Sequence, residues 1–370
     1  MRRLPRIIYL RSDTVTTPTP RMRAAMARAA VGDDVLDEDP TVQELEACSA
    51  ALLGKEDALF LVSGTMANQV AVMCLCRHGQ EIILPDASHI YNLEVGALAT
   101  LAGVQARPLP APRGVYAPDQ LDGAIRAATL QEAESGLVCL ENTFDLNRGL
   151  VVSPKDTDAM ARQAKARDLP VYLDGARLFN AAVALGLPAS RLVASVDAVA
   201  YCLSKGLACP IGAVLHGSRP FIAEARRARQ RLGGGWRQAG VLAAAGLVAL
   251  SEMIDRLAND HARAKRLAGL LAQLGFGIDP ADVETNILHV DLRPVRRSAT
   301  AFASDMAERG VKVKVIAPQA IRMVTHKDVH DGDLERVAEA ASRIITRRGG
   351  RRHALAKTPG RTQRSQPPAD

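Results

Sequence analysis

The sequence predicts an α/β fold, with a large domain built on a mostly parallel, helix-covered sheet and a smaller C-terminal α+β domain. Three observations predict it. Short apolar segments alternate with longer helical patterns, as in sheets whose parallel strands are joined by crossover helices. The chain has 370 residues, 48% of them hydrophobic and 24% charged, which is enough to bury a large core. Polar motifs follow several of the apolar segments, at the sheet edge where such folds bind ligands.

The large domain is expected to span residues 21–255. Six of its segments are apolar and short, as buried strands are. They are residues 58–62, 81–84, 137–140, 171–173, 198–201 and 213–215. Helical patterns are predicted at residues 66–76, 92–101 and 154–167.

The remaining body of the chain predicts an N-terminal arm and a small domain. Residues 1–20 form the arm, which contains Arg11-Ser12-Asp13-Thr14, and an amphipathic helix follows near residues 22–29. A long Ala- and Leu-rich helical stretch at residues 238–274 links the large domain to the small one, residues 256–346. Strands at 286–290 and 321–324 and helices at 300–309 and 333–346 then predict a lid over the sheet edge.

The charge of the chain is concentrated in its last residues. The formal net charge is +7, and residues 347–370 hold seven Lys or Arg against one Asp, which accounts for +6 of it. Glycine and proline pairs interrupt this tail, which has almost no large apolar residues and is expected to be disordered. The basic charge therefore does not indicate a nucleic-acid-binding face; a weak contact of the tail with an acidic partner is the alternative.

Other classes of protein are also disfavoured. The apolar run at residues 7–10 is too short for a secretory signal, and no stretch is long enough to span a bilayer. We therefore expect a cytoplasmic protein without a membrane partner. The six cysteines show no spacing typical of a zinc site and are expected to be buried thiols, so no metal is predicted.

Two strand ends carry the most informative residues. Lys205, in Ser204-Lys205-Gly206, follows one strand, and Asp174, in Asp174-Gly175-Ala176-Arg177, closes another. Their spacing fits one strand–helix–strand crossover, which delivers both to the same edge. A lysine there can hold pyridoxal phosphate as a Schiff base, and a buried aspartate can pair with the protonated pyridine nitrogen. An ordinary surface lysine and a salt bridge between Asp174 and Arg177 are the alternatives.

Two further motifs fit the same cofactor. Ser63-Gly64-Thr65 lies where a strand turns into a helix, so that backbone N–H groups and a hydroxyl can bind a phosphate. His89 follows another strand end and could stack on the pyridoxal ring and transfer protons. By themselves, these features favour plainer interpretations, the first motif as a capped turn and His89 as a solvated loop histidine.

Ten motifs together resemble the low-specificity L-threonine aldolases, within the β-eliminating lyase group of fold type I pyridoxal-phosphate enzymes. The resemblance runs from about residue 8 to 345. The motifs are Leu10-Arg11-Ser12-Asp13-Thr14-Val15-Thr16, Gly32-Asp33-Asp34-Val35, Glu38-Asp39-Pro40-Thr41, Ser63-Gly64-Thr65-Met66, Ser88-His89-Ile90-Tyr91, Glu141-Asn142-Thr143, Asp174-Gly175-Ala176-Arg177-Leu178-Phe179-Asn180, Cys202-Leu203-Ser204-Lys205-Gly206-Leu207, Gly233-Gly234-Gly235-Trp236-Arg237-Gln238 and Val283-Glu284-Thr285-Asn286. The resemblance implies an aminotransferase-like fold with a seven-stranded sheet.

The resemblance also implies a role for each site residue. Lys205 would bind the cofactor covalently, Asp174 would hold its pyridine nitrogen and His89 would stack on its ring. The phosphate would be held by Gly64, Thr65 and Ser204, with Arg237 from a neighbouring subunit. The substrate carboxylate would be bound by Ser12, Arg177 and Arg322, the last of which could otherwise be an exposed strand arginine. A shared site of this kind implies a homodimer or homotetramer.

The implied reaction is cleavage of a β-hydroxy-α-amino acid, such as L-threonine or L-allo-threonine, to glycine and an aldehyde. His89, or a water that it orients, would remove the β-hydroxyl proton. Three positions depart from the family: Phe144 and Gln131 replace histidines, and Gln230 replaces a lysine, for which Arg229 and Arg231 could compensate.

These departures leave alternatives open. A related pyridoxal-phosphate enzyme could perform β-elimination, racemisation or glycyl transfer to another aldehyde. A non-catalytic binding protein acting through the basic tail is the third hypothesis, which the presence of both Lys205 and Asp174 disfavours.

Overall fold

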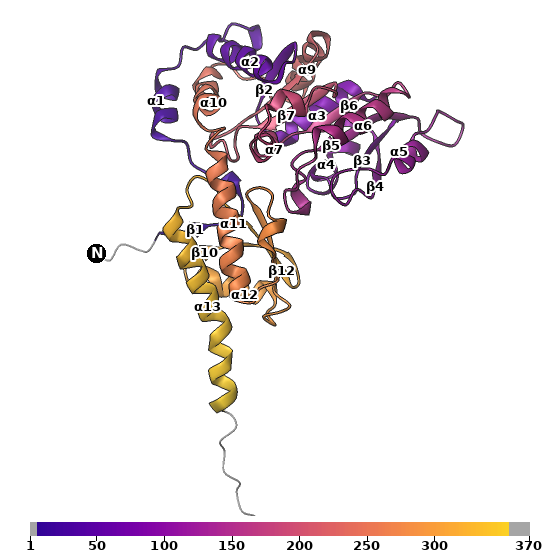
Figure 1. Ribbon diagram of the computed structural model, residues 1–370. Coiled ribbons are helices and arrows are strands. Elements are labelled where there is room, and N and C mark those ends of the chain that lie inside the picture. Colours follow the sequence, from indigo (N-terminus) through magenta and orange to yellow (C-terminus); the bar gives the residue numbers. More distant parts are fainter. Residues whose placement is uncertain (1–5, 355–370) are drawn as a thin grey trace, which may run out of the picture.

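The computed structural model describes residues 6–354, which form a large and a small unit (Figure 1). A seven-stranded sheet with the strand order β2-β8-β7-β6-β5-β3-β4 forms the centre of the large unit. The strands are β2 Asp57–Leu61, β3 Glu81–Pro85, β4 Gln105–Leu109, β5 Ser135–Glu141, β6 Val171–Asp174, β7 Ala198–Cys202 and β8 Ala213–Gly217. The predicted α/β fold with a mostly parallel, seven-stranded sheet is confirmed.

The direction of the strands determines which residues meet. Strands β3 to β7 pair in parallel, whereas β8 is antiparallel to both of its neighbours, β7 and β2. Strand β2 therefore runs in the same direction as β7. As a result, the carboxyl ends of β2, β3, β5, β6 and β7 all lie at one edge of the sheet, where open α/β sheets bind ligands.

Helices cover both faces of this sheet. One face packs against α1 Pro20–Arg28, α2 Pro40–Leu53, α5 Pro118–Ala124, α6 Pro154–Lys165, α7 Leu178–Leu185, α8 Ala189–Leu192 and α10 Gly240–Glu252. The other face packs against α3 Gly64–Leu75, α4 His89–Asn92, α9 Arg219–Arg231 and a π-helical turn at Leu98–Ala102. In β7, Val199 and Tyr201 enter the first core and Ala200 enters the second, as the two-residue period of a strand requires.

Helix starts in the large unit follow from local sequence. Thr19, Asp39 and Ser153 are N-caps whose side chains accept hydrogen bonds from the first turn, and a proline follows each of them. Proline is favoured there because its fixed φ suits a helix and its missing N–H has no helical partner. These caps satisfy N–H groups of the first turn of each helix.

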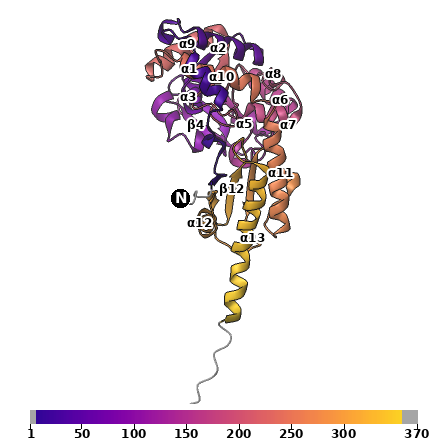
Figure 2. The same ribbon diagram turned by 90° about the vertical axis from the view of Figure 1, so that its left-hand side faces the viewer.

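The small unit packs helices against two small sheets. A three-stranded antiparallel sheet has the order β11-β12-β9, with β9 Ile287–Asp291, β11 Lys314–Ala317 and β12 Ala320–Val324. A parallel pair joins β1 Ile8–Tyr9 to β10 Val311–Lys312. The helices are α11 Leu257–Gln273, α12 Ala299–Glu308 and α13 Asp331–Ala354. Figure 2 shows α11 and α13 lying along the strands of this unit. The N-terminal segment thus contributes Ile8 and Leu10 to the core of the small unit.

Several elements differ from the sequence-based expectation. The helical stretch predicted at 238–274 is two helices, α10 and α11, separated at Met253–Arg256. The helix predicted at 92–101 is broken where Val95 and Gly96 adopt positive φ angles. Helix α13 continues to Ala354, into the tail predicted to be disordered, and residues 355–370 of that tail lie outside the described residues.

No helix within residues 6–354 is long and apolar enough to cross a membrane.

Candidate active site

The predicted site residues of the large unit gather at the common edge of the sheet. Ser63 and Gly64 follow β2, His89 follows β3, Arg177 follows Asp174 at the end of β6, and Ser204-Lys205 follow β7. Arg322 reaches the same region from β12 of the small unit, since it forms an ion pair with Asp145, which follows β5. Side chains of both units therefore meet near this edge.

Asp174 is buried and held by neutral donors. Its Oδ2 accepts a hydrogen bond from Asn68 Nδ2 at 2.8 Å, and its Oδ1 accepts one from the backbone N of Ala176 at 3.0 Å. Asn68 is fixed in turn by Tyr172, whose hydroxyl donates to Asn68 Oδ1 at 2.6 Å. Within the part of the chain that the structure describes, Asp174 forms no salt bridge, so the alternative of an Asp174–Arg177 pair is wrong. Such a buried carboxylate needs a cationic partner.

His89 is oriented by two carboxylates that sequence reasoning had not assigned a role. Glu94 Oε1 lies 2.9 Å from His89 Nδ1 and also accepts from Asn68 Nδ2 at 2.7 Å. Glu141 Oε2 accepts from the backbone N of His89 at 2.7 Å. Ligand atoms of His89, Glu94 and Asp174 all lie within 4.8 Å of one another. A ring nitrogen of His89 therefore lies within 4.8 Å of a carboxylate oxygen of Asp174.

Arg177 forms the centre of a buried ion-pair cluster. Its Nε and Nη2 donate to the two oxygens of Asp13 at 2.8 and 2.7 Å, and its Nη1 lies 3.2 Å from Asp145 Oδ1. Arg322 Nη1 donates to the same Asp145 oxygen at 2.9 Å. The structure therefore brings Arg177 and Arg322 together, both nearly fully buried. The alternative of Arg322 as an exposed strand arginine is wrong.

The pKa values in this cluster follow from burial and charge together. Burial alone would raise the pKa of Asp13, but Arg177 outweighs it and lowers that pKa to about 2. Burial also opposes ionisation of Asp145, whose pKa Arg177 and Arg322 hold well below its usual range. Both carboxylates are therefore charged at neutral pH, and the two arginines are neutralised by two aspartates.

Ser12 and Lys205 lie next to this cluster. Ser12 caps the turn at Asp13–Val15, accepting from the backbone N of Thr14 at 3.2 Å. The hydroxyl of Thr16 donates to the backbone O of Lys205 at 2.9 Å. Lys205 is half-buried, and its charge helps to lower the pKa values of Asp13 and Asp145. The N-terminal segment is thus tied directly to the loop that carries the lysine.

The predicted phosphate-binding residues begin a helix. Ser63 caps α3 by accepting from the backbone N of Met66 at 3.1 Å, and Thr65 is exposed. A Cβ atom on Gly64 would lie 2.6 Å from Cys202 Sγ, so a side chain at this position requires a shift. The first N–H groups of α3 can therefore receive an anion at close range.

Arg237 is the one predicted residue that the structure places apart. Its side chain is 62% exposed and pairs with Asp33 of the same chain at 2.9 Å. It makes no hydrogen bond to Gly64, Thr65 or Ser204 within residues 6–354. Its backbone O accepts from Asp34 N at 2.9 Å, which anchors the glycine-rich segment before it. Within one chain, Arg237 therefore does not bond to the predicted phosphate-binding residues.

The three positions expected to depart from the family pattern lie in different surroundings. Phe144 is fully buried and packs against Gly114, and Gln131 lies in an exposed turn. Arg229, near Gln230, is buried and paired with Asp34 at 2.9 Å. It is Asp145, next to Phe144, that reaches the arginine cluster.

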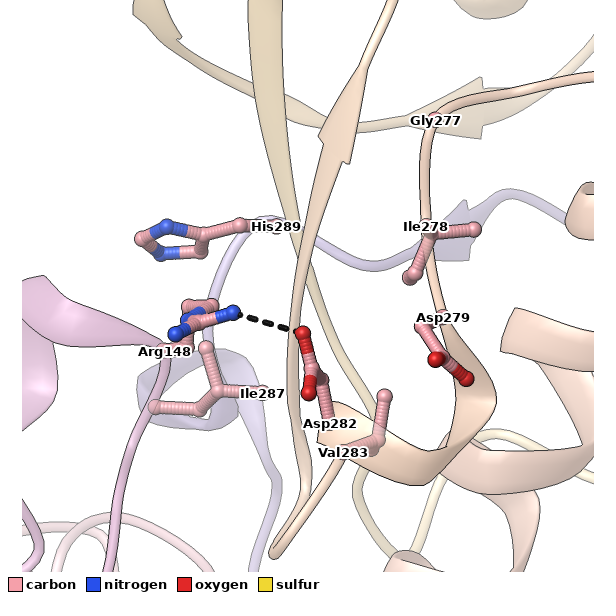
Figure 3. Close-up of a pocket in the computed structure, with 8 residues that line it drawn as sticks. All are labelled: Arg148, Gly277, Ile278, Asp279, Asp282, Val283, Ile287 and His289. Atoms are coloured by element: carbon pink, nitrogen blue, oxygen red, sulfur yellow. Dashed lines mark hydrogen bonds and ion pairs between the residues drawn. The ribbon is translucent and has the colours of Figure 1, made fainter.

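A pocket of about 180 Å³ lies nearby but is not the predicted site. Figure 3 shows Arg148 lying beside His289 and paired with Asp282. His289 on β9 is the direct cross-strand neighbour of Arg322 on β12. The pocket therefore borders the strand that carries Arg322, although none of the predicted site residues lines it.

Comparison with known proteins identifies the family of this chain. The family model described as beta-eliminating lyase matches residues 9–293. The chain belongs to the beta-eliminating lyase family. A probable low-specificity L-threonine aldolase 2 of Arabidopsis thaliana is 42% identical over 346 residues, covering 92% of this chain and 98% of the relative. A low specificity L-threonine aldolase of Escherichia coli (strain K12) is 40% identical over 333 residues, covering 90% and 97%.

Solved structures with lower sequence identity share the fold of this chain. A threonine aldolase of Leishmania major has a TM-score of 0.79 at 19% identity, covering 91% of this chain and 99% of that one. A serine palmitoyltransferase of Sphingomonas wittichii has a TM-score of 0.73 at 18% identity, covering 93% and 88%. The family and fold predicted from the ten motifs are confirmed.

Proposed function

We propose that this member of the family is a pyridoxal-phosphate-dependent aldolase that cleaves L-threonine, L-allo-threonine or related β-hydroxy-α-amino acids to glycine and an aldehyde. The observation that carries the proposal is Asp174, a buried carboxylate held by Asn68 and a backbone N–H, at the sheet edge that also carries Lys205. The names of the Arabidopsis and Escherichia coli relatives support the reaction.

The residues at the edge fit this cofactor. Asp174 would pair with the pyridine nitrogen, because an unpaired buried carboxylate needs a cation. Gly64, Thr65 and Ser204 would hold the phosphate at the start of α3. Lys205 would hold the cofactor covalently and His89 would lie on its ring. When bound, the cofactor supplies an electron sink that accepts the electron pair of the broken Cα–Cβ bond.

The chain's own residues would orient the substrate and move its proton. Ser12, Arg177 and Arg322 would bind the substrate carboxylate, which fixes the rotation of the amino acid and thereby selects the bond that is cleaved. His89, whose Nδ1 is held by Glu94, would take the β-hydroxyl proton on its other ring nitrogen, directly or through a water. Orientation of the imidazole by a carboxylate is what a general base requires.

Assembly and location are further parts of the proposal. If Arg237 serves the phosphate of a neighbouring subunit, as the family resemblance implies, the protein is a homodimer or homotetramer. The exposure of Arg237 is compatible with that role. The cytoplasmic location stays a prediction from the sequence.

The reaction can be tested on a panel of substrates. Purified protein loaded with cofactor is incubated with L-threonine, L-allo-threonine, L-phenylserine and the D-isomers, and aldehyde and glycine are measured. We expect equimolar glycine and aldehyde from at least one L-substrate, and loss of both products in Lys205→Ala. Lys155→Ala, at an exposed lysine on α6, is the matched control and should keep full activity. Pyruvate or a racemised amino acid as the main product would instead support β-elimination or racemisation.

A further inference from the structure

Arg177 and Arg322 already share a carboxylate from their own chain. Asp145 Oδ1 lies 2.9 Å from Arg322 Nη1 and 3.2 Å from Arg177 Nη1. The Asp145 side chain is 10% exposed, and those of the two arginines are 5% exposed or less. We call Arg177 and Arg322 the carboxylate clamp. Asp145 thus occupies part of the clamp.

The position of Asp145 is fixed by the fold. Its backbone N donates to Glu141 Oε1 at 2.8 Å, and the other oxygen of Glu141 accepts from the backbone N of His89. The backbone of Phe144 pairs with Leu150, which closes the loop on which Asp145 lies. Asp145 is therefore held beside the clamp by the same carboxylate that holds His89.

One edge of the Arg322 guanidinium is available to another hydrogen-bond acceptor. Arg177 uses Nε and Nη2 for Asp13. Arg322 uses only Nη1, and its buried Nε has no hydrogen-bond partner among residues 6–354. A buried donor without an acceptor is costly, and the Nε–Nη2 edge of a guanidinium suits a carboxylate. A substrate carboxylate on that edge would lie beside Asp145.

We propose, building on the aldolase function above, that the negative charge of Asp145 at the carboxylate clamp weakens binding of the substrate carboxylate on the free edge of Arg322. Asp13 and Asp145 neutralise Arg177 and Arg322, so a substrate carboxylate enters as a third negative charge. Lys314, the cross-strand neighbour of Arg322, adds a positive charge near the clamp, as Lys205 does beside Asp13 and Asp145. Removing the charge of Asp145 therefore strengthens carboxylate binding, whereas binding of the amine alone is unaffected.

The test compares two ligands that differ in the carboxylate. Glycine, the amino-acid product, and ethanolamine, its analogue without a carboxylate, are titrated calorimetrically into cofactor-loaded wild type, Asp145→Asn and Asp145→Ala. We expect the Kd of glycine to fall about three- to tenfold in both variants, since one repulsive charge is removed at partial burial. The Kd of ethanolamine should change by less than about twofold. Asp282→Asn, which removes a charge paired with Arg148 outside the clamp, should change neither Kd.

The outcomes separate this inference from the proposed function. Weaker or unchanged glycine binding in both Asp145 variants, with wild type binding glycine, overturns the inference alone and makes Asp145 a residue that positions the arginines. Wild type that binds no glycine overturns the proposed aldolase function and the inference with it. The absorbance of the bound cofactor is measured in each variant. An absorbance equal to that of wild type shows that the two substitutions leave the rest of the site intact.

Discussion

The carboxylate of Asp13 accepts two parallel hydrogen bonds from Arg177, from Nε at 2.8 Å and from Nη2 at 2.7 Å. This pair joins the N-terminal segment to the end of β6, and Asn286 of the small unit donates to the same Asp13 at 3.3 Å. The bidentate geometry fixes the plane of the guanidinium. The N-terminal segment, remote in sequence, therefore orients a residue proposed to bind substrate.

Asp13→Asn should damage both stability and substrate binding. Removing one partner of a buried ion pair leaves an uncompensated charge, so we expect the free energy of unfolding to fall by about 3 kcal/mol. The KM for the amino acid should rise about tenfold because Arg177 loses its fixed orientation. Urea denaturation and steady-state kinetics measure the two effects. Asp331→Asn, at the exposed partner of Arg263, is the control and should leave both values unchanged.

Glu94→Gln should lower kcat with little effect on KM. Glu94 accepts hydrogen bonds from His89, Asn68 and Gln69, and an amide has only one oxygen with which to replace these contacts. We expect kcat to fall about tenfold and KM to stay within about twofold, because the proton acceptor is misoriented while the carboxylate clamp is intact. Glu44→Gln, at an exposed position of α2, should keep wild-type kinetics. A rise in KM as large as the fall in kcat would instead show that Glu94 acts in substrate binding.

Gly64→Ala should weaken cofactor binding through contact with Cys202. The new Cβ would meet Cys202 Sγ at 2.6 Å, which displaces the first turn of α3. We expect the Kd of the cofactor, measured by fluorescence, to rise at least about tenfold. Removing the sulfur by Cys202→Ala should have little effect alone and should restore part of the affinity in the double variant. An affinity unchanged by Gly64→Ala would contradict the phosphate site at α3.

His216 should make the protein less stable as the pH falls. Burial lowers the pKa of His216 to about 3, from an ordinary value of 6.5. The ring nitrogens form hydrogen bonds with the Ser49 hydroxyl and with the backbone O of Val199. Because the folded-state pKa is lowered, the unfolded chain takes up the proton first, and stability present above pH 6.5 is lost on acidification. Between pH 7 and pH 5 the free energy of unfolding should fall by about 2 kcal/mol from this group.

Urea denaturation at the two pH values measures this effect. In His216→Gln, the free energy of unfolding should fall by about 2 kcal/mol less between pH 7 and pH 5 than in wild type. The matched variant at an exposed histidine, His78→Gln, should keep the wild-type decrease. Equal pH dependence in wild type and His216→Gln would show that His216 is not held neutral.

Much of the large unit could be predicted because its strands are locally distinct. Residues 198–202 of β7 are all buried, and the sequence there is continuously apolar. Strand β4 is not evident from the sequence, because its residues are mostly half-exposed and it contains Arg107 and Pro108. The break between α10 and α11 is not evident either, since Met253–Arg256 contains neither glycine nor proline.

The candidate site, too, could be predicted only in part from the sequence. Lys205, Asp174 and Arg177 follow strand ends, so their meeting at one edge follows from strand direction alone. Glu94 has no such signal, because it reaches His89 only through the irregular backbone around Val95. Asp145, next to Phe144, also lacks a local signal, because its partners Arg177 and Arg322 come from another strand end and from the small unit. Contacts between units depend on tertiary packing that a local pattern does not encode.

The site at which the cofactor is attached tests the central proposal most directly. Holoenzyme reduced with borohydride, digested and analysed by mass spectrometry should carry the phosphopyridoxyl group on the peptide that contains Lys205. Asp174→Asn should lower the extent of this labelling, because the ring loses its charged partner. A label on another lysine, or no label on protein that has been saturated with pyridoxal phosphate, would contradict the proposed site.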